Sequence, residues 1–571
     1  MRSVRRPALP LPPALPRALR RLCALGLSIA LTACGGEAET PAPLATRAPH
    51  EAVEQLAAAP PEQREALAAE LRKSSPSATA AAAAARHLGS KDREVRRHML
   101  LTLAAWKADG RVVGPAVLAG LSDEAPELRS AAARALGALA PSPPGAVEAL
   151  RAALLDPVSD VRAAAVDGLA ELAPREPAAL AALVEALADP DSEVASNARG
   201  QLCVQGVACV PCLVDTLKGE SAQLARCAAL TLAQLGPLAG TARLALEDVL
   251  QSGTGLLRAA AAVALGRLGA QALPSVPRLL DALADPEREV AEKSVDALGR
   301  ISSVAADAVP LVVAALADPR PPVRVGAARA LQGLALDVER LLPDVTRALS
   351  DPERDVRRET LGMITAWPVG AHRAHAAVLP LVDDVDAGVR AEALLALGRM
   401  SARVEGVALV VAPRLKDPEA QVRLMAAQVL QHLGPKAEVA SELLVAALSD
   451  SDRNVRYYAV LILSGLPQAR ADARETIATM LADEHSSVRR QAAQALGATG
   501  AEAAPAVPTL IGLLEDADSD VREAAARALG LIGPEGARQA LEALDRLAGD
   551  PAQPATVRRA ARKAYDRLRG A

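Results

Sequence analysis

A 33-residue repeat is the feature that most restricts what this chain can fold into. Asp318-Pro319-Arg320-Pro321-Pro322-Val323-Arg324 is matched 33 residues later by Asp351-Pro352-Glu353-Arg354-Asp355-Val356-Arg357. The same pattern starts at Asp123, Asp156, Asp189, Asp285, Asp384, Asp417, Asp450, Asp483, Asp516 and Asp550, with degenerate copies at Ser90, Gly219 and Ser252. A fixed period of this size is typical of a stack of identical small units and argues against several separate globular domains.

Each copy predicts two helices around a turn. After the turn, Val323, Ala327, Leu331 and Leu334 fall on one face of a helix. The Asp-Pro pair ends the preceding helix, because the residue before proline avoids the α region. Neither helix has enough apolar surface to fold alone, so neighbouring copies must complete the core. A chain that is 51% hydrophobic and contains no Phe fits closely packed helices, and poorly fits a β-sandwich or barrel.

The repeats resemble the HEAT repeat family in its bacterial, phycobilisome-lyase-like form, over residues 75–571. The resemblance implies an all-α solenoid superhelix of about fifteen two-helix repeats with a concave surface lined by the second helices. It also implies a ladder of hydrogen bonds between adjacent repeats. In this ladder, the Arg that lies six residues after the turn Asp of one repeat donates to the turn Asp of the neighbouring repeat. A buried row of Arg needs carboxylates nearby in any case. The residues named for the ladder are Asp318, Arg324, Asp351, Arg357, Asp417, Arg423, Asp450 and Arg456. The alternative role for these arginines is a stripe that binds anions.

The N-terminus has the pattern of a bacterial lipoprotein signal. Residues 1–33 carry six Arg and no acid, and an apolar run from Leu22 ends at Ala33-Cys34-Gly35. Resemblance to a lipobox implies that Cys34 carries the lipid and, because Gly35 is not Asp, that the protein lies at the periplasmic face of the outer membrane. An ordinary signal peptide or a single anchor helix is the alternative. We expect a tether at 34–50 and capping helices at 51–74. Removal of the signal changes the formal charge from −4 to −10, which disfavours nucleic acid as a partner.

Four cysteines cluster where the repeat pattern is weakest. Gly219 stands where the Asp belongs and Ala225 where the Arg belongs. Because an oxidising periplasm favours disulfides, we predict Cys212–Cys227 and Cys203–Cys209 bonds as staples for the missing rung, with other pairings open. A redox pair of Cys209 and Cys212 and a zinc site are the alternatives, although the redox motif lacks its βαβ context and zinc would need a second pair.

No catalytic, metal-binding or cofactor-binding motif is evident. Two consecutive repeats instead replace the small residues that usually follow the ladder Arg with larger ones, Leu424-Met425 and Tyr457-Tyr458. These four residues are the candidate partner-binding site, and local packing is the alternative explanation. We therefore expect a non-catalytic, membrane-anchored scaffold that binds a protein or peptide and no small-molecule substrate. The alternatives are an enzyme or accessory of the lyase type and a structural spacer.

Overall fold

The computed structural model describes residues 48–332, 334, 338–367 and 369–570. Within these ranges the chain is helical throughout and contains no strand. The predicted signal segment, residues 1–33, and the lipidation site Cys34 lie outside the described residues. The structured part begins with α1 (Pro49–Ala58) and α2 (Pro61–Lys73), so the first helix starts two residues earlier than the expected 51–74 caps.

Fifteen helix pairs follow in the described residues. The first helices of these pairs are α3 (Ala78–Arg86), α5 (Gly110–Gly120), α7 (Ala146–Ala153), α9 (Ala178–Glu185), α11 (Val210–Leu217), α13 (Arg243–Ser252), α15 (Val276–Asp281), α17 (Ala308–Ala314), α19 (Val338–Leu349), α21 (His375–Val378), α23 (Val407–Val411), α25 (Ser441–Ala447), α28 (Arg474–Thr479), α30 (Val507–Gly512) and α33 (Leu541–Gly549). Short helices α27 (Pro467–Asp472) and α32 (Pro534–Ala537) precede α28 and α33.

The second helices are longer on the whole. They are α4 (Arg93–Ala105), α6 (Pro126–Ala138), α8 (Ser159–Leu172), α10 (Ser192–Gln205), α12 (Ala222–Leu235), α14 (Gly255–Arg267), α16 (Arg288–Val304), α18 (Pro321–Ala330), α20 (Arg354–Thr365), α22 (Ala387–Met400), α24 (Ala420–Leu433), α26 (Arg453–Gly465), α29 (Ser486–Gly497), α31 (Ser519–Ile532) and α34 (Ala555–Arg569).

Short 3₁₀ segments shape the turns on both sides of the first helices. They are η3 (His87–Gly89), η4 (Ala186–Ala188), η5 (Gly206–Cys209), η6 (Gly236–Ala242), η7 (Gly269–Ser275), η8 (Ala282–Ala284), η9 (Ala315–Ala317), η10 (Ala371–Ala374), η11 (Leu379–Asp383), η12 (Ala412–Lys416), η13 (Gly434–Ala440), η14 (Met480–Ala482), η15 (Gly500–Ala506), η16 (Leu513–Glu515) and η17 (Arg538–Ala540).

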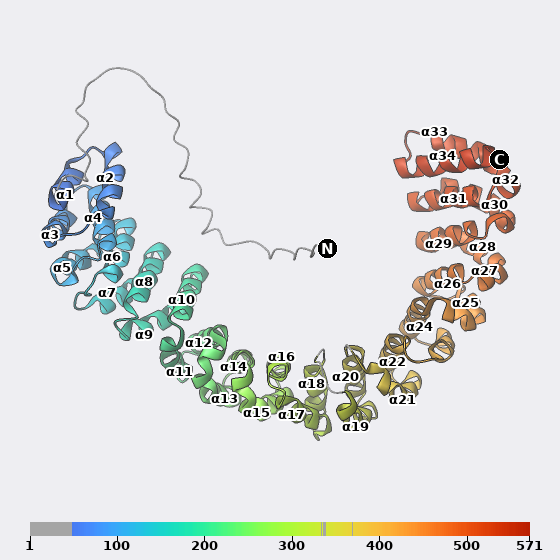
Figure 1. Ribbon diagram of the computed structural model, residues 1–571, viewed down its shortest axis with the longest axis horizontal. Coiled ribbons are helices and arrows are strands. Elements are labelled where there is room, and N and C mark those ends of the chain that lie inside the picture. Colours follow the sequence, from blue (N-terminus) through green and yellow to red (C-terminus); the bar gives the residue numbers. More distant parts are fainter. Residues whose placement is uncertain (1–47, 333, 335–337, 368, 571) are drawn as a thin grey trace, which may run out of the picture.

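The helix pairs stack side by side into an open arc, with the second helices on the inner side and the first helices on the outer side (Figure 1). Each second helix packs on the second helix of the next repeat, as α6 does on α8 and α14 on α16. The α-solenoid expected from the sequence is therefore confirmed. The second helices of successive repeats together form a concave surface that runs along the arc.

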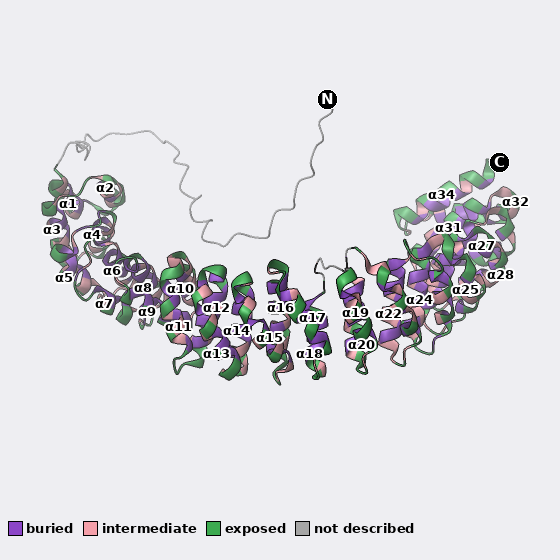
Figure 2. Ribbon diagram, turned by 60° about the horizontal axis from the view of Figure 1, so that its bottom comes forward, coloured by how far each residue is buried: buried purple, intermediate pink, exposed green. Residues whose placement is uncertain are grey.

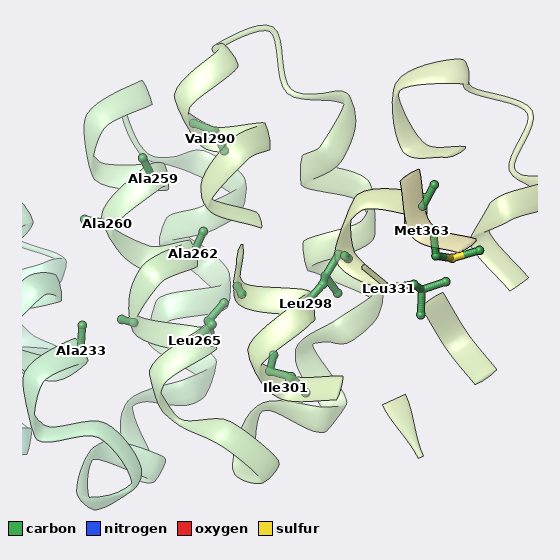
Figure 3. Close-up of a cluster of buried hydrophobic side chains, with 14 of the residues drawn as sticks. Ala233, Ala259, Ala260, Ala262, Leu265, Val290, Leu298, Ile301, Leu331 and Met363 are labelled. Atoms are coloured by element: carbon green, nitrogen blue, oxygen red, sulfur yellow. The ribbon is translucent and has the colours of Figure 1, made fainter. Parts of the chain in front are cut away.

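The core is a continuous layer that follows the arc. Buried residues occur in every repeat between the two rows of helices, while exposed residues lie on the outside (Figure 2). In the middle of the arc, α14 carries small buried residues such as Ala259 and Ala262, and the neighbouring α16 carries larger ones such as Leu298 and Ile301 (Figure 3). Small residues on one helix leave room for large residues on the next, which lets the interior reach a high packing density.

Glycine sets the closest helix contacts. A Cβ atom on Gly137 of α6 would lie 2.5 Å from the Cα of Gly168 in α8. The same relation recurs one repeat apart between Gly497 and Ala528, at 2.8 Å, and between Gly530 and Ala564, at 2.9 Å. These three pairs of second helices approach each other through a position that has no side chain, so a larger residue at these glycines would force the helices apart.

One helical run, Ser192–Leu217, is long and apolar enough to cross a membrane, judged by length and composition only. In the structure this run consists of α10, η5 and α11, which belong to two successive repeats. The chain changes direction at Gly206, whose φ of +60° is a conformation that favours glycine. The run is thus two packed solenoid helices joined by a turn.

Candidate functional site

The ladder expected from the sequence is present, and Arg324 shows the geometry of one rung. Its Nε and Nη2 donate to the two carboxylate oxygens of Asp351 at 2.7 and 2.9 Å. Its Nη1 donates to the main-chain oxygen of Asp318 at 2.9 Å. Each such guanidinium joins the turn of its own repeat to the turn of the next, with the two-pronged geometry that makes Arg–carboxylate bonds strong.

Ten rungs of this kind occur in the described part of the chain. Nine are two-pronged contacts with at least one N···O distance of 2.6–2.7 Å, and Arg96 makes a longer contact of 3.1 Å. They are Arg96–Asp123, Arg129–Asp156, Arg162–Asp189, Arg258–Asp285, Arg324–Asp351, Arg357–Asp384, Arg390–Asp417, Arg423–Asp450, Arg456–Asp483 and Arg489–Asp516. The N–H groups of these guanidinium groups already donate to carboxylate and carbonyl oxygens of the protein. The geometry of the rungs therefore favours a structural role for the arginines over an anion-binding stripe.

The rungs change the electrostatics of their carboxylates. Hydrogen bonds from Arg129 lower the pKa of Asp156 despite partial burial. At Asp417, burial is the largest effect and works to raise the pKa, but the hydrogen bonds from Arg390 and from the main chain of Glu419, together with the nearby positive charges, outweigh it and the pKa is lowered. These carboxylates stay ionised at neutral pH, as a charge-paired ladder requires.

The ladder is interrupted in the middle of the arc. Ala195 and Ala225 stand at the positions where other repeats carry the ladder Arg. The corresponding Asp positions of the next repeats hold Gly219 and Ser252, so neither pair can form a rung. Ala291 also stands at an Arg position, so the preceding repeat supplies no arginine to Asp318. Arg320 donates to Asp318 instead, from Nε at 2.9 Å. The sequence therefore locates the weakest part of the ladder in the repeats around α10–α16.

The four cysteines in this region are free thiols. The expected Cys212–Cys227 and Cys203–Cys209 disulfides are not formed in the structure, and this is a correction to the sequence-based pairing. Cys209 is fully buried, and its Sγ lies 3.1 Å from Gly206 O and 3.3 Å from Leu202 O. Its thiol is thus directed at the carbonyl groups of its own turn.

The position of Cys209 explains why it is buried without a disulfide. It directly precedes Val210-Pro211, and Ser275 and Ala506 precede the same dipeptide in other repeats. Those two residues are buried as well, so the turn requires a small side chain, a role that cysteine fills. Burial raises the pKa of the Cys209 thiol to about 11, which disfavours the reactive thiolate needed for the redox alternative.

The described residues contain no group of three or more His, Cys, Asp or Glu side chains arranged to hold a metal ion.

The candidate partner-binding residues lie on the inner helices α24 and α26, which pack on each other. Leu424, Met425, Tyr457 and Tyr458, here called the concave patch, are each partly buried against the core and partly exposed. The rings of Tyr457 and Tyr458 meet edge to face with centroids 5.4 Å apart. The structure therefore gathers these four residues, and their contact with the core shows that they also contribute to packing.

Sequence reasoning missed the surroundings of the concave patch. Leu395 and Leu461 are partly exposed at equivalent positions of α22 and α26, four residues after Ala391 and Tyr457. The pKa of the Glu392 carboxyl group, on α22, is raised. Burial is the main cause, and the nearby charge of Glu359, on α20, is the second. The repeat register could have located all three residues, because it places them on the face that carries the patch.

A second feature of the concave face was also missed. A groove with a volume of about 450 Å³ lies between α31 and α34, and Arg527, Arg559, Lys563 and Arg567 are among its lining residues. The signal in the sequence was the spacing of Arg559, Lys563 and Arg567, which are four residues apart and so share one helix face.

Two solved structures show low similarity to this chain. Kap121p bound to RanGTP is 15% identical, with 88% of this chain and 59% of that chain covered and a TM-score of 0.47. Yeast importin-beta, Kap95p, is 15% identical, with coverage of 91% and 88% and a TM-score of 0.33. No curated protein matches the chain.

The family assignment rests on a different comparison. A family model described as HEAT repeats matches residues 114–203, 276–365, 441–506 and 483–566, which together make up more than half of the chain. The helix pairs and the ladder described above agree with that match. This chain belongs to the HEAT repeat family.

Proposed function

We propose that this protein is a lipid-anchored scaffold that binds other proteins along its concave face. The observation that carries the proposal is the concave patch. Tyr457, Tyr458 and Met425 interrupt an inner surface that is otherwise formed mainly by small and polar side chains, and none of the three is fully buried. Aromatic and Met side chains are enriched in the centre of protein interfaces, where their large apolar surfaces supply contact area.

The length of the concave surface supports a protein or peptide partner rather than a small molecule. A surface shared by many stacked helices allows contacts distributed over several repeats, whereas a small-molecule site needs an enclosed pocket with convergent polar groups. The net charge of −10 expected after signal removal disfavours nucleic acid. No observation favours the lyase-type enzyme over the scaffold.

The membrane anchor and its location are part of the proposal and rest on the N-terminal sequence. Six arginines, a short apolar run and Cys34 followed by Gly35-Gly36 support lipidation of Cys34 and a position at the periplasmic face of the outer membrane. Replacement of Cys34 by Ser tests this. We expect the variant to leave the membrane fraction and the N-terminal peptide of the wild type to carry a lipid mass. An unmodified Cys34 in the mature wild type would contradict the anchor.

Site-specific photocrosslinking in the native cell tests partner binding. A photoreactive residue replaces Tyr457, and a matched control replaces Leu244, an apolar residue that is 61% exposed on α13 in the outer row. We expect a discrete crosslinked protein from position 457 and none from position 244. The same partner should be lost from a pull-down with the Tyr457→Ala, Tyr458→Ala double variant. Absence of any crosslink from position 457 would favour the structural spacer.

A further inference from the structure

The groove at the C-terminal end of the arc is unlike the rest of the concave surface in charge. Helix α34 carries six basic residues and one acidic residue, in a chain whose formal charge is negative. We call the groove between α31 and α34 the C-terminal groove. Its lining residues include Arg527 and Leu531 of α31 and Arg559, Lys563 and Arg567 of α34.

Three of its cations have no carboxylate partner. Arg527 pairs with Glu523, and Arg562, on another face of α34, pairs with Asp545 at 3.2 Å. Arg559, Lys563 and Arg567 are exposed and form no ion pair with any described residue. Three free positive charges on one face of a helix create a local positive potential that attracts anions.

The floor of the groove is apolar. Leu531 of α31 is 52% exposed, and Ala560 and Ala564 of α34 line the groove beside it. The two helices approach closely at Gly530, where a Cβ would lie 2.9 Å from the Cα of Ala564. An apolar floor with a cationic rim fits a ligand that has both aliphatic side chains and carboxylates.

The groove faces the same way as the concave patch. Arg559 follows Arg558 of its repeat directly, just as Tyr457 follows Arg456, and Lys563 corresponds in the same way to Leu461. The two features are therefore on one surface, three repeats apart. At about 10 Å per repeat, an extended chain of about nine residues spans that separation.

From these observations we propose that the C-terminal groove binds an acidic segment of the protein partner, one in which Asp or Glu residues alternate with aliphatic residues. This inference rests on the proposed function and adds the chemical class of the partner. A flat bilayer cannot follow a floor recessed between two helices of a concave face. A nucleic acid duplex, which carries a phosphate charge about every 1.7 Å, would be repelled by the acidic remainder of the arc.

Binding of defined probes tests the assignment. The full-length protein in detergent is titrated into a fluorescein-labelled peptide in which Asp and Leu alternate, and into the same peptide with Asn in place of Asp. We expect binding of the Asp peptide only, weakened by salt. We expect Arg559→Gln, Lys563→Gln and Arg567→Gln together to weaken it at least about fivefold, given that exposed charge pairs each contribute modestly. Leu531→Ser should weaken it as well.

A charge-matched control separates the groove from net charge. Lys91→Gln, Lys218→Gln and Arg403→Gln together remove three exposed positive charges from interhelix turns, and this variant should bind the peptide as the wild type does. Equal affinity of the wild type and the groove variant for the Asp peptide would overturn the inference. So would stronger groove-dependent binding of phosphatidylglycerol vesicles or of a 20-base-pair DNA duplex. Crosslinking from position 457 reports on the proposed function separately, so the two failures are distinguishable.

Discussion

Arg390 donates from Nε and Nη2 to the two carboxylate oxygens of Asp417 at 2.8 and 2.7 Å, and both residues are more than nine-tenths buried. This pair is the most enclosed rung of the ladder. It joins α22 to the turn before α24, and it lies one repeat from the concave patch. Its integrity therefore bears both on the stability of the arc and on the placement of the candidate binding residues.

Replacement of Arg390 by Met should destabilise the protein by about 2–3 kcal/mol, because it leaves the Asp417 carboxylate buried without its partner. Urea denaturation followed by circular dichroism measures the change. The control is Arg288→Met, which removes an exposed pair with Glu292 within α16 and should have little effect. Equal losses in the two variants would contradict a special contribution from the ladder.

The interruption at Asp318 can be repaired. Ala291→Arg places an arginine six residues after Asp285, at the position from which the intact repeats form the rung, and Ala291 is only partly buried. We expect a gain of about 1 kcal/mol from a new charge-assisted bond to Asp318. Ala291→Lys, which cannot make the two-pronged contact, should gain less. If both variants are equally stable, or neither gains, the rung has not formed.

The close helix contact at Gly137 predicts a steric penalty. Gly137→Ala should destabilise the protein by about 1–3 kcal/mol, since the new Cβ would overlap Gly168 and force α6 and α8 apart. Gly200, in the interior of α10, has nothing within 4 Å of its expected Cβ. Gly200→Ala should therefore stabilise by about 1 kcal/mol through helix propensity. Thermal unfolding of the two variants distinguishes a packing effect from a general effect of glycine.

The ladder also predicts sensitivity to acid. The pKa values of Asp156, Asp417, Asp483 and Asp516 are lowered in the folded protein, so their contribution to stability is complete above the pKa of unfolded Asp, about 3.9. It is lost progressively as the pH falls below that value and through the lower folded pKa values. Denaturation midpoints across this range measure the loss. Asp417→Asn should show a shallower dependence than the wild type, and an identical slope would contradict the role of this rung.

The buried thiols should react slowly. Burial raises the pKa of Cys209 to about 11, so almost none of it is thiolate at pH 8, and its sulfur is shielded from solvent. Alkylation by iodoacetamide without denaturant should modify Cys203 before Cys209, and unfolding in urea should remove the difference. Peptide mapping without reductant checks the four free thiols directly. A Cys212–Cys227 peptide pair in that map would restore the original disulfide prediction.

The sequence by itself determined the helical repeats, their number and the register of the ladder. These features depend on spacing along the chain: the 33-residue period aligns each Arg with the Asp of the following repeat, 27 residues away. Each helix pair that keeps both residues therefore presents the same groups to its neighbour. The interruptions at Ala195, Ala225 and Ala291 could be located for the same reason.

Only the tertiary structure decided how side chains meet across the stack. It left Cys212 and Cys227 unpaired although their distances from the turn are similar, because the direction of each side chain depends on helix packing. It also brought Arg527 of α31 beside Lys563 of α34, with an exposed leucine between the helices. Such contacts depend on how closely two helices approach, which is determined by residues such as Gly530 and Ala564 together and by neither sequence position alone.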